Sequence, residues 1–518
     1  MINIRHIAKL ANLTLSAKEL KIYTKQLKTI LGYIDKLSQI DTSQVKPTFQ
    51  TIDNTVNIWR KDKVKKSLSQ KQTLSQTKRR YKGYFVTENV FSQTDKKTTA
   101  VKNKPRKKLD KYNAVLTQVN PQGRLGHKDL FLTKDIETTA GAKILEGYIP
   151  QYSATIVKQL ETAGYKTKNK LNQDAWAHGS SGENSDFYPT KNPWDLTKVP
   201  GGSSSGSAAA VASGIVDIAT GTDTCGSIRL PSSFTNTCGI KPTYGALSRY
   251  GVIAFASSLD CPGFFARSVT QLKKVFKQTS QPDSYDATSQ SKARQKKYKT
   301  KVKTIGLPKE FFTKGIDKQV KQTVEQAANL FKSKGYKIKQ VSLPHSGYSI
   351  AAYYIIAPTE ASSNLARYDG IRFANDRLYF GAEAKRRIML GSFASSSGYA
   401  DKYYEQAAKI RTLIINDFAK AFKKVDVILA PTAPTPAFKL GEKTADPLQM
   451  YLMDIYTAPA SLSGLPSLAL PCGFTKNKLP IGMQLIGPRW TEAMLFNLGE
   501  QYQQLTNWHN LKPPTIYD

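Results

Sequence analysis

Apolar side chains recur at every third or fourth position near the start of the chain. They form one stripe made of Leu20, Tyr23, Leu27, Ile30, Ile34 and Leu37. This spacing predicts an amphipathic helix over residues 16–40, and Ser16 followed by Glu19 is the capping-box pattern that begins such a helix. A shorter helix is expected before it, from the positions Ile4, Ile7, Leu10 and Ala11. Two such helices bury too little apolar surface to be stable alone, so both should pack on another part of the protein.

The segment from Val45 to Phe91 carries few helical signals and predicts an extended arm lying across another surface. Residues 94–112 are polar, basic and nearly free of large apolar side chains, which is typical of a linker. The chain is therefore expected to divide into an N-terminal unit over 1–93, a basic linker over 94–112 and a large domain over 113–518.

Beyond the linker, helical patterns alternate with short runs rich in β-branched and apolar residues. The clearest runs are 302–308, 336–344, 425–434, 465–474 and 480–488. Alternation of this kind predicts an α/β fold in which a parallel or mixed sheet is covered by helices.

Composition narrows the class of protein further. A hydrophobic content of 40% with 22% charged residues is typical of a folded domain. The sequence contains no run of about 18 apolar residues, so no transmembrane helix is expected. The four cysteines form no CxxC pair and the five histidines are scattered, which argues against a disulfide framework or a metal site. The net charge of +37 favours a polyanionic partner, although a solvated basic surface explains it equally well.

Candidate chemistry lies in residues 200–229, PGGSSSGSAAAVASGIVDIATGTDTCGSIR, where serines occupy two glycine-rich turns. A Gly/Ser-rich run is usually a flexible linker, but here a helix-favouring alanine run follows it directly. A serine nucleophile needs a proton acceptor, and the few histidines and the missing G-x-S-x-G motif give a Ser-His-Asp triad little support. Lys128, in GRLGHKDLFLTKD, is the candidate base because burial lowers the pKa of a lysine.

Several long motifs in this part of the chain resemble the amidase-signature family. They include PGGSSSGSAAA, GTDTCGSIRLPSSF and GIKPTYGALSRYGVIAFASSLD. Within the family, three further motifs resemble the A subunits of glutamyl-tRNA(Gln)/aspartyl-tRNA(Asn) amidotransferases: ENSDFYPTKNPWDLTKVPGGSS, EASSNLARYDGIR and KRRIMLG. The first 93 residues, with HIAKLANLTLS and KGYFVTENV, resemble the C subunit of the same enzymes. The resemblance implies a fusion in which a helical hairpin and a belt precede an amidase-signature fold, a large mixed β-sheet covered by helices on both faces.

The resemblance also implies a catalytic triad. Ser227 matches the nucleophile, Lys128 the general base, and Ser203, after a cis peptide at Gly202, the serine that passes a proton between them. The backbone N–H groups of Thr224, Cys225, Gly226 and Ser227 match the oxyanion hole, which stabilises the negative charge of the tetrahedral intermediate.

The implied substrate is glutamine, whose α-carboxylate and α-ammonium require opposite charges. Arg387 matches the residue that binds the carboxylate, with neighbouring Arg386 as the alternative, and Asp454 matches the acid that meets the ammonium. Tyr353 matches a further substrate contact. Ser180 is expected to line the pocket.

The implied activity is that of a glutaminase component that releases ammonia to convert Glu-tRNA(Gln) to Gln-tRNA(Gln), Asp-tRNA(Asn) to Asn-tRNA(Asn), or both. A separate B subunit would bind ATP and Mg²⁺ and make most contacts to tRNA, so no cofactor and no metal are expected in this chain. A bacterial cytoplasm is the expected setting. The basic, acid-free start also resembles an organellar presequence, which makes an organelle the alternative.

Departures from the family pattern keep two other readings open. Ser205 and Cys225 stand where the family usually has glycine, and both the approach to Lys128 and residues 371–385 are short. A silenced site would leave a non-catalytic scaffold that binds tRNA or assists assembly. A free-standing amidase acting on small amides is the second alternative, against which the C-like N-terminus argues.

Overall fold

The computed structural model begins with the two helices that the apolar pattern predicts. It describes residues 3–52, 59, 61–64, 66–77, 79–87, 106–289, 301–313, 315–372 and 375–517. Helix α1 spans Ile4–Leu10, and α2 spans Ala17–Ile34 with a 3-10 turn after it. The capping box is confirmed: Ser16 Oγ accepts the N–H of Glu19, and the Glu19 carboxylate accepts the N–H of Ser16.

The apolar stripe of α2 is buried, except that Leu20 is only partly covered. The expectation for Leu10 is wrong, because this side chain at the end of the short helix α1 is 55% exposed. Ala11, which caps the helix, is buried in its place.

An extended segment follows and confirms the predicted arm over its first part. Residues 42–49 run along helix α11, Gln406–Phe422, where the N–H of Thr48 donates to the carbonyl of Ala408 at 3.1 Å. The ring of Phe49 stacks on Tyr404 with centroids 5.7 Å apart. Later parts of the arm are not all extended, because they contain helix α3, Gln70–Leu74, and the two-stranded hairpin of β1, Arg80–Tyr81, and β2, Tyr84–Phe85.

The predicted linker is described only from Arg106 onward, and this end packs on the large domain. Arg106 Nη2 forms an ion pair with Glu137 at 2.5 Å. The Asp110 carboxylate accepts three backbone N–H groups from the turn before the first strand of the large sheet. Residues 88–105 lie outside the described residues, so the boundary at 93 stays a prediction, and the boundary at 112 stays one as well.

Eleven strands form one mixed sheet in the described chain, in the order β10-β9-β11-β13-β12-β7-β8-β6-β4-β5-β3. The strands are β3 Val115–Gln118, β4 Leu125–Lys128, β5 Thr167–Leu171, β6 Ile218–Thr222, β7 Cys238–Lys241, β8 Pro262–Ala266, β9 Thr304–Pro308, β10 Lys337–Val341, β11 Val427–Pro431, β12 Ser467–Phe474 and β13 Pro480–Ile486. All five runs predicted as strands are strands, β9 to β13. Both parallel and antiparallel pairs occur, which confirms the predicted mixed sheet.

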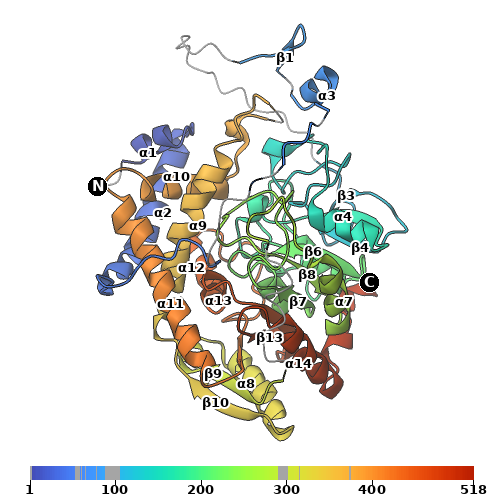
Figure 1. The fold of residues 1–518 in the computed structure, drawn as a ribbon, viewed down its shortest axis with the longest axis vertical. Helices are drawn as coiled ribbons and strands as arrows, with labels where there is room; N and C mark the ends of the chain where they lie inside the picture. The colour runs from blue at the N-terminus through green and yellow to red at the C-terminus, as the bar shows by residue number, and fades with distance from the viewer. Residues whose placement is uncertain are drawn as a thin grey trace.

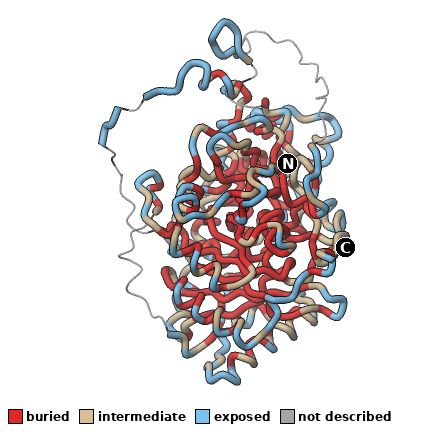
Figure 2. Tube along the Cα trace, turned by 90° about the vertical axis from the view of Figure 1, so that its right-hand side faces the viewer, coloured by how far each residue is buried: buried red, intermediate tan, exposed pale blue. Residues whose placement is uncertain are grey.

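Helices cover both faces of this sheet, as Figure 1 shows. Successive residues of β11 belong to different cores: Val427 and Leu429 pack with one, Ile428 and Ala430 with the other. One core is shared with α4 Thr155–Thr162, α7 Val269–Thr279, α8 Lys318–Ser333 and α14 Glu492–Leu505. The other is shared with α1, α2, α11, α9 Ser349–Leu365 and α10 Ala382–Ala394. Figure 2 shows the buried interior that results. Among the described residues, none of the helices has the length and apolar character needed to cross a membrane.

Two glycine substitutions should have opposite effects on stability. Gly32 lies exposed inside α2 and a Cβ there meets nothing within 4 Å, so Gly32→Ala should stabilise by about 0.5–1 kcal/mol. Gly206 lies in the buried helix α5, Ser205–Ala212, where a Cβ would come within 2.5 Å of the Ala114 carbonyl oxygen. Gly206→Ala should therefore destabilise by about 1–3 kcal/mol. Thermal melting midpoints of the two variants should move up and down respectively, and a lowered midpoint for Gly32→Ala would contradict the packing of α2.

Candidate active site

Lys128 ends strand β4 and is completely buried beside the parallel strand β6. Its backbone N–H donates to Thr220 Oγ1 at 3.1 Å, which fixes the end of the strand. Its Nζ bonds to Ser203 Oγ and to Thr222 Oγ1, each at 2.8 Å. The amine is therefore surrounded by hydroxyl groups, and no ion pair in the described part of the chain includes it.

Burial lowers the pKa of Lys128 to about 7, because the protonated amine loses its hydration. The nearby carboxylates of Asp174, Asp223 and Asp260 oppose this effect by favouring the charged form. A lysine with this pKa is largely neutral just above pH 7, so its nitrogen can accept a proton from Ser203.

Ser203 and Ser227 lie in two adjacent turns. The Gly202–Ser203 peptide bond is cis, as the family resemblance implies, and the Ser203 carbonyl accepts the N–H of Asp174 at 3.1 Å. The next residue, Ser204, donates its N–H to the carbonyl of Ser227 at 3.2 Å, which joins the two turns. Ser227 is 6% exposed. Among the hydrogen bonds of the described residues, none links the hydroxyls of Ser203 and Ser227.

The turn that carries Ser227 runs from β6 to helix α6, Arg229–Thr235, and is held by a buried ion pair. Arg229 binds Asp223 through two nitrogens, at 3.0 Å each, and both side chains are fully buried. Burial alone would raise the pKa of Asp223, but the Arg229 guanidinium outweighs it and holds this pKa below its usual value.

The predicted oxyanion donors are free within this turn. No hydrogen bond among the described residues uses the backbone N–H of Thr224, Cys225, Gly226 or Ser227 as a donor. Buried N–H groups are almost always paired, so a run of four unpaired ones fits a site that receives an oxygen atom.

Asp454 lies directly over this turn. A Cβ placed on Gly226 would be 2.5 Å from Asp454 Oδ1, so the two groups are in contact. Asp454 Oδ2 accepts the hydroxyl of Ser180, whereas Oδ1 is buried without a partner. Burial raises the pKa of Asp454 to about 7, and the Ser180 bond opposes this rise.

Arg387 supplies the opposite charge from helix α10. Its Nε donates to Glu383 at 2.8 Å, and its guanidinium lies 5.1–5.6 Å from the ring centroids of Phe255, Tyr354 and Tyr451. Its Nη1 is buried without a hydrogen-bond partner. A buried guanidinium with one unused edge can bind a carboxylate.

The neighbouring Arg386 is bonded to helix α2 and to Glu383. Its Nε donates to Gln26 on helix α2 at 3.0 Å, and its guanidinium forms an ion pair with Glu383. Both arginines touch the same cavity, but only Arg387 has a buried nitrogen left without a partner. The geometry thus favours Arg387 as the carboxylate ligand.

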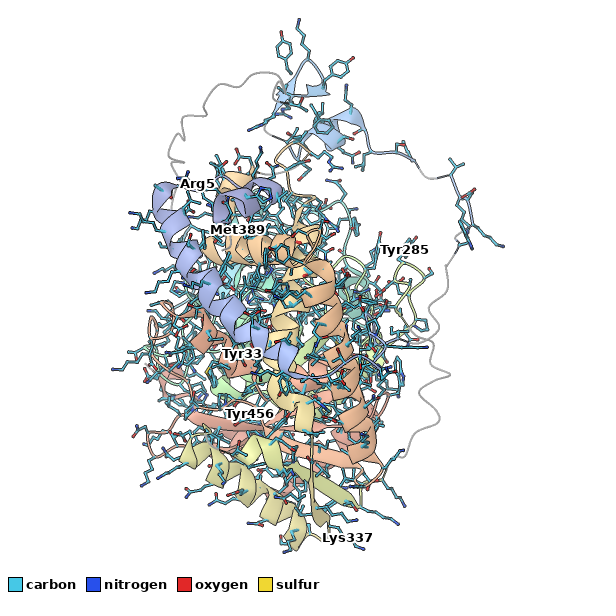
Figure 3. The ribbon with its side chains drawn as sticks, turned by 90° about the vertical axis from the view of Figure 1, so that its left-hand side faces the viewer. Arg5, Tyr33, Tyr285, Lys337, Met389 and Tyr456 are labelled. Atoms are coloured by element: carbon cyan, nitrogen blue, oxygen red, sulfur yellow. The ribbon has the colours of Figure 1, made fainter. Side chains whose placement is uncertain are left out.

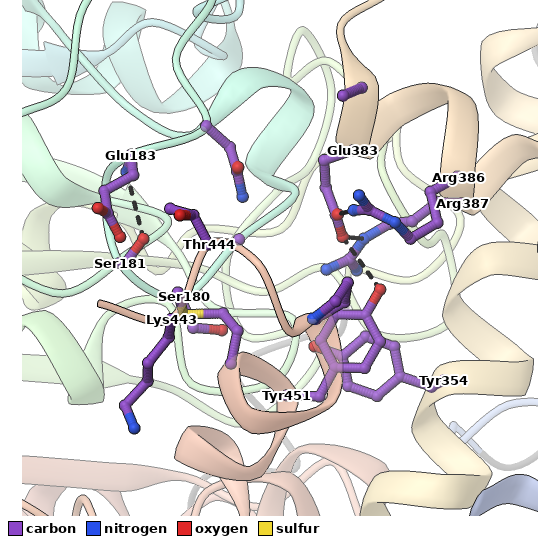
Figure 4. Close-up of a pocket in the computed structure, with 15 residues that line it drawn as sticks. Ser180, Ser181, Glu183, Tyr354, Glu383, Arg386, Arg387, Lys443, Thr444 and Tyr451 are labelled. Atoms are coloured by element: carbon purple, nitrogen blue, oxygen red, sulfur yellow. Dashed lines mark hydrogen bonds and ion pairs between the residues drawn. The ribbon is translucent and has the colours of Figure 1, made fainter. Parts of the chain in front are cut away.

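A cavity of about 150 Å³ lies beside Arg387 and Ser180, and Figure 4 shows the residues that line it. Its lining includes Ser180, Glu383, Arg387 and the stacked rings of Tyr354 and Tyr451, whose centroids are 3.6 Å apart. Lys128, Asp454 and the two catalytic candidates Ser203 and Ser227 are not part of this lining. Contacts connect the cavity to the turn of Ser227: Ser180 bonds to Asp454, and Asp454 contacts Gly226.

The remaining predicted residues also lie at the site. Tyr353, on α9, is buried among Cys225, Arg387 and Asp454, and burial raises its pKa well above the usual value. Cys225 is buried in the turn, where burial raises the pKa of its thiol well above the usual range, with Asp454 adding to this effect. A thiol in that state is not a nucleophile.

Ser205, the other departure from the family pattern, has a clear structural place. It is fully buried and its hydroxyl bonds to Thr190 Oγ1 at 2.9 Å. Its Cβ occupies space left open by Gly182, where a Cβ would come within 2.6 Å of it. The substitution is therefore accommodated without disturbing Ser203.

Three residues of the site were missed by sequence reasoning. Glu383 precedes Arg386 and Arg387 by three and four positions, a spacing that signals a helical ion pair and could have revealed it. Asp174, buried against Gly202, and His178, buried beside Phe255 with both ring nitrogens unpartnered, gave no such signal.

Comparisons with known proteins agree with this geometry. The model of the family described as Amidase matches residues 125–496, so the chain belongs to the amidase family. A second model, described as Glu-tRNAGln amidotransferase C subunit, matches residues 15–86. Within the amidase family, the chain thus joins a domain similar to the A subunits of glutamyl-tRNA(Gln) amidotransferases to a C-subunit-like N-terminal segment.

Individual relatives support the same placement. The A subunit of glutamyl-tRNA(Gln) amidotransferase from Myxococcus xanthus (strain DK1622) is 52% identical over 401 residues, which cover 73% of this chain and 82% of that protein. The crystal structure of the protein of that name from Thermotoga maritima is 40% identical, with a TM-score of 0.65 over 74% of this chain and 86% of that one. The structure of 6-aminohexanoate cyclic dimer hydrolase, at 20% identity and a TM-score of 0.68, over 76% of this chain and 86% of that one, shares the fold.

All four cysteines should resist alkylation in the folded protein. Each is buried, and burial raises every thiol pKa, to about 11 for Cys261 and about 12 for Cys238. Iodoacetamide at pH 8 reacts with thiolates, so we expect almost no label on the native chain and four labels after unfolding in denaturant. Mass spectrometry counts the labels, and rapid labelling of Cys225 in the native chain would contradict the inert thiol.

Proposed function

We propose that this chain is the glutamine-hydrolysing component of a tRNA-dependent amidotransferase. The observation that carries the proposal is the buried Lys128, bonded to Ser203 and without an ion-pair partner in the described chain, together with two unpaired charged atoms: one on Arg387, which lines the pocket, and one on Asp454, which bonds to the pocket residue Ser180. Those two atoms, Arg387 Nη1 and Asp454 Oδ1, match the α-carboxylate and α-ammonium of an amino acid. Glutamine is such a zwitterion with an amide at the far end of its side chain, and the matched relatives are named as amidotransferase subunits.

Acylation begins with neutral Lys128 accepting the proton of Ser203 as Ser203 accepts that of Ser227. This transfer requires the Ser227 hydroxyl to turn toward Ser203, which a change of its χ1 rotamer would supply. The Ser227 oxygen then attacks the side-chain carbonyl carbon of glutamine. The resulting oxyanion accepts hydrogen bonds from the free N–H groups of residues 224–227. Each such donor typically stabilises the transition state by about 3 kcal/mol. Return of the proton through Ser203 to the leaving nitrogen breaks the C–N bond and releases ammonia.

Deacylation uses the same groups again. Water gives a proton through Ser203 to Lys128 as its oxygen attacks the ester carbon on Ser227. The ester C–O bond then breaks, the proton returns from Lys128 through Ser203 to the Ser227 oxygen, and glutamate is released. We place the use of the ammonia in a separate B subunit, which would bind ATP, Mg²⁺ and most of the tRNA. That complex would act in the cytoplasm on glutamyl-tRNA(Gln), aspartyl-tRNA(Asn) or both.

Replacing Ser227 with alanine should abolish glutaminase activity. Loss of an acyl-forming nucleophile commonly lowers kcat by about 10³-fold or more. The measurement is glutamate release from glutamine by the chain co-expressed with a homologue of the B subunit, with the wild type and Ser207→Ala as controls. Ser207 is also buried in this serine-rich stretch but bonds the Thr220 carbonyl and does not reach Lys128. Equal glutamate release by wild type and Ser227→Ala would refute the assignment.

Activity should also fall in acid because the base must be neutral. Burial lowers the pKa of Lys128 to about 7, so its neutral form dominates above that pH and disappears below it. We expect kcat for glutamine to rise through pH 7 and level off above about pH 8. Asp454, whose pKa burial raises to about 7, affects substrate binding in the same pH range and so appears in KM. A kcat that is flat from pH 5.5 to 8.5 would exclude Lys128 as the base.

A further inference from the structure

The C-like segment contacts the helix that carries the arginine of the site. Helix α2 lies against α10 on the side of the domain seen in Figure 3, where Tyr33 and Met389 mark the two helices. The Tyr23 hydroxyl donates to the carbonyl of Ala382 at 3.2 Å. Lys385 Nζ forms an ion pair with Glu19 at 2.8 Å. These contacts fix the first turns of α10 on the surface of α2.

A chain of side-chain hydrogen bonds continues from α2 to the pocket. Gln26 Oε1 accepts from Arg386 Nε at 3.0 Å, and the Arg386 guanidinium pairs with one oxygen of Glu383. The other Glu383 oxygen accepts from Arg387 Nε at 2.8 Å and from the Tyr451 hydroxyl at 3.3 Å. Figure 4 shows the part of this chain from Arg386 to Tyr451. Gln26 is thus three hydrogen-bonded steps from Arg387.

Each step restricts the next one. Gln26 accepts a hydrogen bond from Nε of Arg386. With its guanidinium oriented in this way, Arg386 pairs through Nη1 with only one oxygen of Glu383. The second oxygen stays available to Arg387, whose Nε bond sets the plane of its guanidinium. That plane decides where the unpaired Nη1 points, and bidentate recognition of a carboxylate depends on this orientation.

Without Gln26, the Arg386 guanidinium is free to turn and to compete for both oxygens of Glu383. Arg387 would then lose part of its orientation. The rings of Phe255, Tyr354 and Tyr451 also hold Arg387, so the loss should be partial.

We propose that Gln26 is a positioning residue for the glutamine site, acting through Arg386 and Glu383 on Arg387. The C-like segment then serves substrate recognition as well as packing. This inference rests on the proposed glutaminase function.

The test is steady-state kinetics of Gln26→Leu in the full chain co-expressed with a homologue of the B subunit. We expect KM for glutamine to rise three- to tenfold while kcat stays within twofold of wild type. L-Glutamate, which keeps the α-carboxylate, should inhibit more weakly by the same factor. The inhibition constant of 4-aminobutanamide, glutamine without that carboxylate, should stay unchanged. A general loss of structure would weaken both inhibitors alike.

Three further variants make the result specific. Lys385→Met removes the neighbouring ion pair with Glu19 across the same interface but leaves Glu383 untouched, so its KM should match wild type. Gln26→Glu keeps an acceptor for Arg386 and should restore the wild-type KM. In an Arg386→Leu background, Gln26→Leu should add nothing, because the intermediate step is already missing.

Two kinds of failure are distinguishable. If wild type releases no glutamate from glutamine, the proposed function is wrong. If wild type is active but Gln26→Leu leaves KM unchanged, or Lys385→Met raises it equally, then Gln26 has no positioning role. Thermal melting of each variant identifies any variant that fails to fold. If Gln26→Leu fails to fold, the KM of Gln26→Glu is compared with that of Lys385→Met instead. A KM of Gln26→Glu well above wild type would also overturn the positioning role of Gln26.

Discussion

The turn from Asp223 to Arg229 is held by a salt bridge from which water is excluded, and the geometry of the site depends on it. Breaking such a buried pair by removing one partner typically costs about 3–5 kcal/mol, because the other charge is left without compensation. Arg229 also bonds to the Cys225 carbonyl and to Gln484 of β13, so the same guanidinium fixes the turn and ties it to the centre of the sheet. The Asp223 carboxylate accepts the N–H groups of Ile228 and Arg229 at the end of the turn, so those of residues 224–227 are left free. This is how four adjacent donors remain unpaired at the position of Ser227 without the loop collapsing to satisfy them.

Burial has opposite consequences for the two halves of the site. Around Lys128 it removes hydration from an amine that has no carboxylate partner in the described chain, so the neutral base becomes accessible near pH 7. Around Arg387 and Asp454 each charge keeps one partner, Glu383 or Ser180, and one unsatisfied atom. Leaving such buried atoms unpaired is unfavourable. A zwitterionic ligand that supplies both missing partners removes this cost, which favours an amino acid over a simple amide as the substrate.

The parts of the structure predicted from sequence are those set by local pattern. Helix α2 follows from a stripe and a cap within a few turns, and strands β9 to β13 from short apolar runs. The choice between Arg386 and Arg387 has no such local basis, because both line the cavity. Only the packing of α10 on α2 pairs Arg386 with Gln26, while Arg387 keeps a nitrogen without a partner. The Gln26–Arg386 bond joins residues 360 positions apart, so no local signal exists for it. The triad was reached through family resemblance, since Lys128 has no distinguishing pattern of its own.

The site divides along the architecture of the fold. Lys128, Ser203 and Ser227 lie at the ends of β4 and β6 and before α5 and α6, within the sheet and the short buried helices on it. Tyr353 and Arg387 lie on α9 and α10, the helices against which α2 packs, while the extended arm follows α11. The reaction half is thus supported by the amidase domain alone, and the recognition half is supported from outside by the C-like segment. Covalent fusion keeps that segment at a high effective concentration, which adds to the apolar packing of α1 and α2 on the domain in keeping it docked. Under the proposed role of Gln26, the affinity of such a chain for glutamine depends in part on the docking of its N-terminal segment.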